Sequence, residues 1–201
     1  MTRSDLEPIV RWVAPGARVL DLGCGDGSLL KELWQAKRAP GYGVEIDDAG
    51  VLACLGNDVN VLQMDLEDGL SAFRDDSFDC VILSETLQAI RNTEQLLREM
   101  LRVGHEAIVS FPNFGHWRIR LQLLLNGAMP VTDNLPDSWY DSPNIHFCTI
   151  KDFREMCEVA GVKMEKSVAL NPWGAPLRLN APWWFWNLFG EQAVFLLSRR
   201  D

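Results

Sequence analysis

The sequence predicts an α/β fold, a three-layer sandwich in which a mostly parallel β-sheet lies between two layers of helices. Short, almost continuously apolar segments alternate with segments of helical periodicity, which is typical of parallel strands buried on both faces. Right-handed crossovers then place the connecting helices on the two sides of the sheet. A chain of 201 residues is long enough for one substantial core, so we expect residues 1–201 to form a single domain.

The alternation is regular up to Pro112. The first strand is expected at 18–23 and runs through a glycine-rich turn into a helix whose leucines share one face. The expected strands of this half are 18–23, 41–46, 59–65, 78–84 and 105–112, and the expected helices are 27–37, 47–58 and 92–103. This order is that of repeated strand–helix–strand units.

The pattern changes after Pro112, where we expect an insertion at about 113–150. It contains a helical segment at 115–127 and a connection at 128–147 that is rich in proline and aspartate. Connections of this length in a compact domain are usually lids or binding loops. The alternation then resumes with a helix at 149–161 and strands at 162–170 and 192–200.

A tryptophan-rich segment at about 171–191 separates those two strands. Trp173, Trp183, Trp184 and Trp186 lie within 14 positions of one another. Tryptophan is enriched at binding hot spots, which favours an interface. A segment folded onto the core is the other interpretation, and some rings could instead lie against a bound cation.

Composition excludes several classes of protein. A net charge of −9 argues against a nucleic-acid partner, because such affinity rests on lysine and arginine. The five cysteines include no C-x-x-C pair and the three histidines have no metal-ligand spacing, so we expect free thiols, a cytoplasmic location and no metal. The most apolar segment, 181–197, is interrupted by polar residues and is marginal for a bilayer span, so no membrane association is expected.

The glycine-rich turn "DLGCGDG" at 21–27 indicates a ligand site. It lacks the lysine of a P-loop, and its glycines run G-x-G-x-G, with Ser28 where a nicotinamide or flavin loop needs a third glycine. Asp26 places a negative charge where a pyrophosphate would approach the helix. That charge is compatible with a ligand that carries an ammonium and a sulfonium, which points to S-adenosylmethionine (SAM).

Acidic residues at the following strand ends fit the same ligand. Glu45 follows Gly27 by 18 positions, near the spacing at which an acid reaches ribose hydroxyls. Asp65 can accept from an adenine amino group, with Met64 and Leu66 covering the base. In open α/β sheets ligands bind at the carboxyl ends of the strands, where all these residues are expected to lie.

Taken together, the motifs "DLGCGDG", "GYGVEID", "NVLQMD" and "FDCVILS" resemble the superfamily of SAM-dependent methyltransferases with a Rossmann-like sheet. The resemblance implies seven strands, the last of them, 192–200, antiparallel. It also implies SAM or S-adenosylhomocysteine as ligand. The cofactor-binding residues expected on this basis are Asp21, Gly23, Gly25 and Gly27 at the methionine end, Glu45 and Ile46 at the ribose, Met64, Asp65 and Leu66 at the adenine, and Ser84 and Glu85 at the methyl group.

Three further stretches resemble a narrower family. "SETLQAI" at 84–90, "SFPNFGHWRIRLQLLLNGAMPVT" at 110–132 and "WYDSPNIHFCTIKDF" at 139–153 are similar to the methionine-biosynthesis MetW family. That resemblance implies a role in methionine synthesis beside homoserine O-acyltransferase, which activates homoserine. The oligomeric state stays open.

Whether the chain transfers a methyl group is also left open. A neutral nucleophile needs a base within hydrogen-bond reach. The candidates are Glu85, His116, Tyr140 and His146, although Glu85 could cap a helix, His116 could begin one, and the other two could simply hold the insertion. "FPN" at 111–113 does not match the Asn/Asp-Pro-Pro-aromatic loop of amino-methylating enzymes. The alternative is a SAM-binding module that activates or regulates the acyltransferase.

Overall fold

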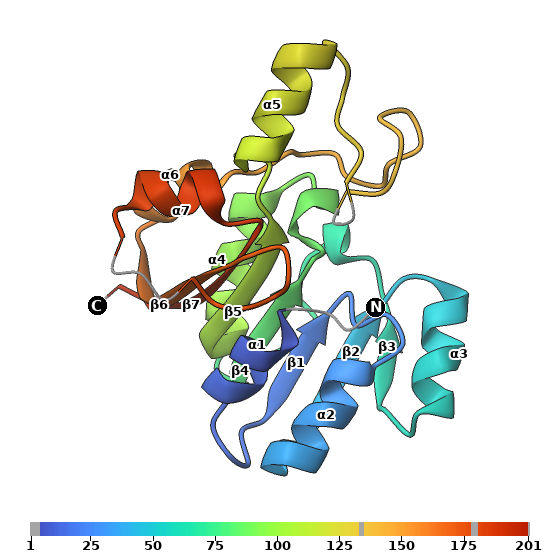
Figure 1. Ribbon diagram of the computed structural model, residues 1–201. Helices are drawn as coiled ribbons and strands as arrows, with labels where there is room; N and C mark the ends of the chain where they lie inside the picture. The colour runs from blue at the N-terminus through green and yellow to red at the C-terminus, as the bar shows by residue number, and fades with distance from the viewer. Residues whose placement is uncertain (1–4, 133–134, 178–180, 201) are drawn as a thin grey trace.

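The computed structural model describes residues 5–132, 135–177 and 181–200, and it is an α/β sandwich (Figure 1). The α-helices are α1 (Leu6–Trp12), α2 (Ser28–Lys37), α3 (Asp48–Gly56), α4 (Thr93–Val103), α5 (Trp117–Asn126), α6 (Ile150–Val159) and α7 (Trp183–Phe189), and two short 3₁₀ helices are η1 (Leu66–Asp68) and η2 (Leu87–Ala89). The strands are β1 (Val19–Leu22), β2 (Gly41–Glu45), β3 (Val61–Gln63), β4 (Phe78–Ser84), β5 (Gly104–Pro112), β6 (Val162–Leu170) and β7 (Gln192–Arg199).

The seven strands form one sheet in the order β3-β2-β1-β4-β5-β7-β6. Strands β1 to β5 pair in parallel, whereas β7 lies between β5 and β6 and is antiparallel to both. The predicted fold class is therefore confirmed, including the antiparallel last strand. The chain order reverses at β1, from which β2 and β3 extend to one side and β4 to the other, and this is where open α/β sheets bind ligands.

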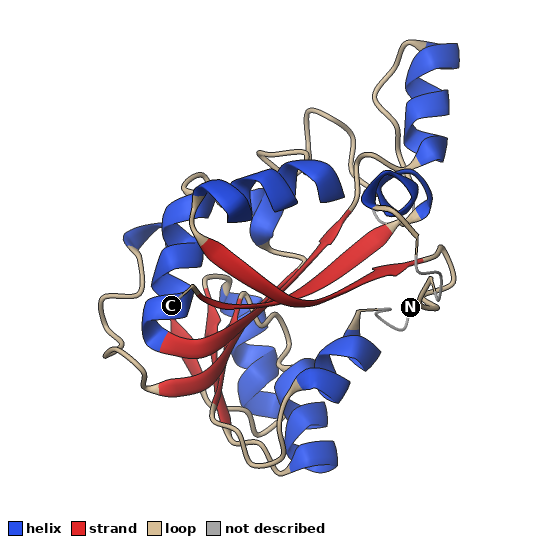
Figure 2. Cartoon of the chain, turned by 90° about the vertical axis from the view of Figure 1, so that its left-hand side faces the viewer, coloured by secondary structure: helices blue, strands red, loops and turns tan. Residues whose placement is uncertain are grey.

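Side chains of the central strands alternate between two hydrophobic clusters, one on each face of the sheet. In β1, Leu20 and Leu22 enter the cluster that packs under α4 and α6, and Val19 enters the cluster under α1 and α2. The helices cover both faces of the twisted sheet in Figure 2. This period of two, with apolar residues on both faces, explains why the strands are almost continuously apolar in sequence.

Two helices form where no element was predicted. Helix α1 lies against the sheet through Ile9, and α7 forms within the tryptophan-rich segment. The third strand, β3, is also shorter than the predicted 59–65, because it ends at Gln63 and Asp65 already caps η1.

In its described part, the insertion consists of α5 and of irregular segments at 127–132 and 135–149 that precede α6. Helix α5 stands away from the sheet in both views (Figures 1 and 2). Helix α6 starts at Ile150 because the Thr149 hydroxyl accepts from the Asp152 N–H at 3.2 Å. Over the described ranges, no helix is both long enough and apolar enough to cross a membrane.

Candidate functional site

The glycine loop after β1 is clamped to the neighbouring strand. The amides of Gly23 and Cys24 both donate to the Val44 carbonyl, at 2.8 and 3.0 Å. Gly23, Gly25 and Gly27 all have positive φ, which favours glycine. A Cβ on Gly23 would lie 2.5 Å from the Thr86 Oγ1, whereas one on Gly25 would meet nothing within 4 Å. The loop therefore presents an open cradle of backbone on the Gly25 side.

The Glu45 carboxylate joins the glycine loop to the turn after β2. Its Oε2 accepts from the Gly25 N–H at 2.8 Å, and its Oε1 accepts from the N–H groups of Ile46 and Asp47 at 2.8 and 3.0 Å. A carboxylate offers about four acceptor positions, so these three bonds leave capacity for a further donor. Glu45 thus fixes the loop and still fits hydroxyl groups.

Asp65 follows β3 and caps η1. Its Oδ1 accepts from the Glu67 N–H at 2.9 Å, which is the ordinary role of an acid at a strand end. The neighbouring Leu66 is buried, and Met64 packs against the core. The Asp65 carboxylate thereby lies beside two apolar side chains, a suitable wall for a flat heterocycle.

These residues surround a cavity of about 370 Å³ at the carboxyl edge of β1, β2 and β4, within the size range of small-ligand sites. Its lining brings together seven of the eleven predicted ligand-binding residues: Gly23, Glu45, Ile46, Met64, Asp65, Leu66 and Glu85. Gly25 and Gly27 belong to the adjoining loop, and Asp21 and Ser84 are buried in the ends of β1 and β4. The lining residues that sequence reasoning missed are Val44, Glu67, Thr86, Ala89, Ile90, Pro143 and Asn144.

Ser84 takes part in a buried polar cluster instead of lining the cavity. Its hydroxyl donates to the Asp5 carboxylate and lies 2.9 Å from the Ser110 hydroxyl. Ser110 donates to the same Asp5 oxygen at 2.7 Å, and all three side chains are buried. Asp5 directly precedes α1, so this cluster ties the start of the described chain to the ends of β4 and β5.

Glu85 lies at the cavity in a conformation rare for a residue with a side chain. Its φ is +57°, in the left-handed region, and its N–H donates to the Ser110 carbonyl at 3.0 Å. The Gln192 side chain of β7 donates to its carboxylate at 2.7 Å. Glu85 therefore holds an oriented carboxylate against β7 rather than capping the helix that follows β4.

The other three candidate bases lie outside the cavity lining. His116 is the buried residue before α5; burial, with a smaller effect of Arg118, lowers the pKa of its imidazole to about 4. Tyr140 is exposed and stacks edge-on against Trp139. The His146 ring lies 3.3 Å from the Arg91 carbonyl, and this contact holds the insertion against the segment after β4.

The same insertion reaches the rim of the cavity. The N–H groups of Ile145 and His146 donate to the Gln88 carbonyl at 2.8 and 3.0 Å. The two residues before them, Pro143 and Asn144, line the cavity. Pro143 and Asn144 are far in sequence from the other lining residues, and no local sequence pattern predicts that they reach the cavity.

Asn113 of the "FPN" segment is fully used by the fold. Its Oδ1 accepts from the N–H groups of Gly115 and Ile150, at 3.0 and 3.2 Å. Its Nδ2 donates to the carbonyls of Asn187 and Gly190, at 3.0 and 2.7 Å. One buried amide therefore joins the end of β5 to α6 and α7, which agrees with the mismatch to an amino-methylating loop.

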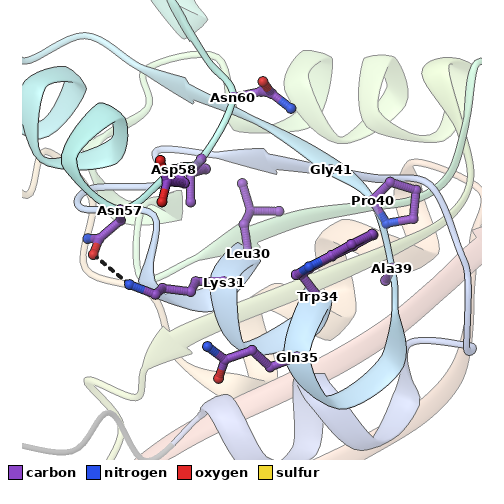
Figure 3. A pocket seen from close by; sticks show the side chains of 11 residues that line it. Leu30, Lys31, Trp34, Gln35, Ala39, Pro40, Gly41, Asn57, Asp58 and Asn60 are labelled. Atoms are coloured by element: carbon purple, nitrogen blue, oxygen red, sulfur yellow. Dashed lines mark hydrogen bonds between the residues drawn. The ribbon is translucent and has the colours of Figure 1, made fainter.

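A larger cavity, of about 510 Å³, lies at the opposite end of the strands (Figure 3). Leu30 and Trp34 of α2 form one wall, and Lys31 donates to the Asn57 side chain at 3.0 Å across its edge. This hollow opens at the amino ends of β2 and β3. Because ligands of open α/β sheets bind at carboxyl ends, the smaller cavity is the candidate site.

The tryptophans are divided between core and surface. Trp183 and Trp186 pack against the core in an edge-on pair 5.3 Å apart, and Arg154 lies 4.3 Å from the centre of the Trp183 ring. Trp173 and Trp184 are exposed. No tryptophan is among the residues that line the 370 Å³ cavity in the described chain.

The sheet order and the glycine-loop cavity place the chain in the class I fold of SAM-dependent methyltransferases, a fold shared with many solved structures. An S-adenosylmethionine-dependent methyltransferase from Mesorhizobium loti has a TM-score of 0.70 at 16% identity, over 98% of this chain and 99% of that one. A SAM-dependent methyltransferase from Archaeoglobus fulgidus has a TM-score of 0.68 at 18% identity, over 98% and 92%. The [4+2]-cyclase SpnF has a TM-score of 0.66 at 16% identity, over 98% and 81%. Identities this low show the fold alone, and one fold hosts different reactions.

The family model for methionine biosynthesis protein MetW matches residues 3–197, and the chain belongs to this family. A curated relative is the bifunctional methionine biosynthesis protein MetXA/MetW from Rhodopirellula baltica. It is 40% identical over 173 residues, which are 82% of this chain and 28% of the relative. This chain thus spans little more than a quarter of that relative's length.

Proposed function

We propose that this chain binds SAM in the 370 Å³ cavity and acts in methionine synthesis with homoserine O-acyltransferase, activating it or regulating it. The observation that carries the SAM site is the position of Glu45. Its carboxylate joins the glycine loop to the turn after β2 and faces a cavity of suitable size. The partner is supported by the relative in which MetXA and MetW, two functions of one pathway, share a single polypeptide.

Different residues around the cavity bind different parts of SAM. Glu45 accepts hydrogen bonds from the ribose hydroxyls, and Asp65 accepts one from the adenine amino group, with Met64 and Leu66 against the base. The open face of the loop at Gly25 lets backbone approach the methionine moiety. The anionic side chains of this edge suit a cationic ligand. When bound, SAM supplies a methyl group activated by its sulfonium.

Regulation of the acyltransferase follows from the chemistry of the pathway. SAM is made from methionine, so a protein that binds SAM can report the level of the end product to the enzyme that activates homoserine. In this role SAM, or its demethylated product, changes the affinity of the chain for the acyltransferase. By linkage, the acyltransferase changes the affinity of the chain for SAM by the same factor.

Methyl transfer to a small-molecule or protein acceptor is the second candidate function. The specific observation in its favour is Glu85, which lies at the cavity with a positive φ and with its carboxylate held by Gln192. Unusual backbone conformations cluster at functional sites. A carboxylate oriented in this way can accept the proton of a nucleophile.

Titration of the purified chain with SAM, followed by calorimetry, tests the binding site. Glu45→Ala removes an acceptor whose hydrogen bonds contribute about 1.5–3 kcal/mol each, so we expect SAM affinity to fall roughly 10- to 150-fold. Glu32→Ala, which removes an exposed acid of α2, is the matched control and leaves affinity unchanged. If Glu45→Ala binds SAM as the wild type does, the ribose is not held here.

Kinetic assays separate the two functions. Homoserine acylation is measured with and without this chain, and again with SAM present. A change in acylation rate supports the partner role, whereas an unchanged rate without co-purification rejects it. Transfer of label from methyl-labelled SAM to a pathway metabolite or protein supports the second function.

A further inference from the structure

Helix α5 carries an apolar face that no described part of the chain covers. Leu124 is 80% exposed, Leu125 is 71% exposed and Leu121 is 42% exposed, and Ile119 is the only buried residue of the helix. Spacings of three and four place the three leucines on one side of the helix. The helix projects beyond the sheet in both views (Figures 1 and 2). We call Leu121, Leu124 and Leu125 the α5 face.

Exposed apolar side chains continue into the rest of the insertion. Met129, Val131, Trp139 and Tyr140 are all exposed, and the last two stack edge-on with ring centres 5.7 Å apart. Single exposed apolar residues are common, but a helix face followed by a run of them marks an interaction surface. The recognition mode that fits is a helix laid in an apolar groove, read by anchors three and four residues apart.

We propose, resting on the proposed function, that the α5 face docks into an apolar groove of homoserine O-acyltransferase that has acidic residues at one end. Arg118 and Arg120 lie in the first turns of α5, and the helix contains no acidic residue. The partner groove therefore matches leucines along its length and one exposed cation, Arg118, at its start, because the Arg120 Nε donates to the Gly115 carbonyl at 2.6 Å. In the bifunctional MetXA/MetW relative both functions share one polypeptide, an arrangement that raises the effective concentration of any two surfaces that bind one another.

Charge disfavours the other two occupants. Pairing of α5 with α5 of a second copy brings two arginines from each helix and no carboxylate from either, so that pairing gains no ion pair. A bilayer with anionic lipids is disfavoured because the chain has a net charge of −9. The acyltransferase is the occupant that sequence and structure together favour.

The position of the surface connects it to the SAM cavity. The insertion that begins with α5 also supplies Pro143 and Asn144 to the cavity lining, and Ile145 and His146 attach it at Gln88. A partner seated on the α5 face therefore contacts the same insertion that supplies two residues to the cavity lining.

Leu124→Asp tests the docking surface on the full-length chain. We expect it to weaken binding to purified homoserine O-acyltransferase at least tenfold by biolayer interferometry and to abolish co-purification. The control is Leu52→Asp on α3, where the leucine is 68% exposed on a different helix, and it should bind within twofold of the wild type. SAM affinity and melting temperature report that both variants are folded.

Each other outcome overturns the inference. If Leu124→Asp binds the acyltransferase as tightly as the wild type does, the α5 face is not the docking surface, and the proposed function is unaffected. If the wild-type chain neither binds the acyltransferase nor changes the rate of acylation, both the docking surface and the proposed function are rejected. A wild-type dimer that Leu124→Asp converts to monomer, with acyltransferase binding unchanged, assigns the α5 face to a second copy. If the wild-type chain pellets with anionic phospholipid vesicles and Leu124→Asp does not, the α5 face binds a membrane surface.

Discussion

Helices α4 and α5 lie on either side of β5 along the chain and use their apolar residues differently. Helix α4 buries Leu96, Leu97, Met100, Leu101 and Val103 against the sheet, and its last residue leads directly into β5. Helix α5 starts five residues after β5 ends and buries Ile119 alone. Both segments are rich in leucine, so leucine content alone does not tell which helix the protein's own sheet will cover. Helix α4 therefore contributes to the core, whereas the α5 face is left uncovered by the described part of the chain.

The sharpest test of this contrast is the same truncation on both helices. Leu97→Ala opens a cavity in the core and should lower the free energy of unfolding by about 2–5 kcal/mol. Leu124→Ala removes an exposed side chain and should change it by less than about 0.5 kcal/mol. Urea unfolding followed by circular dichroism measures both. Equal losses would show that α5 is packed against the body of the protein and would remove the contrast.

A second comparison sets a glycine of the cavity against one at the end of α5. Gly23→Ala combines a positive φ with a Cβ 2.5 Å from Thr86, whose hydroxyl is itself bonded to the Ser84 carbonyl, so we expect a loss of about 2–4 kcal/mol and weaker SAM binding. Gly127→Ala has the positive φ but nothing within 4 Å, so we expect about 1 kcal/mol and unchanged SAM binding. Thermal unfolding and calorimetry distinguish them. A Gly127→Ala variant as damaged as Gly23→Ala would contradict the open surroundings of α5.

The smallest expected effect is a pH dependence at the base of α5. Burial lowers the pKa of His116 to about 4, below the value of roughly 6.5 in an unfolded chain, so the unfolded state binds the proton first. Stability should therefore be unaffected above about pH 7 and should fall between about pH 6.5 and 4, by roughly 1–3 kcal/mol.

His116→Gln should remove that fall, while His105→Gln, at an exposed position, should keep it. Urea denaturation of the three proteins at pH 7 and pH 4.5 measures the difference, and the acidic groups with lowered pKa values titrate alike in the wild type and in His116→Gln, because no acidic group shifts the pKa of His116. A wild type and His116→Gln with parallel pH profiles would place His116 in contact with solvent.

The fold could be predicted because its signal is local. A strand buried on both faces is apolar at successive positions, as in residues 80–83 of β4, and the apolar positions of the connecting helices repeat every three to four residues. The antiparallel direction of β7 came only from the family resemblance, because antiparallel and parallel strands buried on both faces look alike in sequence. Helix α7 escaped prediction since its segment, Trp183–Phe189, is apolar or aromatic at nearly every position and has no clear period.

The candidate site could be predicted where its residues lie at the ends of consecutive strands. Gly23 follows β1, Glu45 is the last residue of β2 and Asp65 lies shortly after β3, and the carboxyl ends of parallel strands meet at one edge. Pro143 and Asn144 reach that edge from a loop more than fifty residues beyond β4, which no local pattern reports. Ser84 was expected at the ligand, yet it is bonded to Asp5, a partner from a segment for which the sequence predicted no element.

The place of β7 has a consequence for how the sheet is completed. β6 pairs only with β7 in the described sheet, and β7 is the later of the two in the chain. During synthesis, the parallel strands β1 to β5 can therefore pair with one another before β7 is made, whereas β6 has no strand to pair with until then. The sheet is complete when β7 pairs with both β5 and β6, so residues up to about 199 must have left the ribosome before the last two of the seven strands can join it.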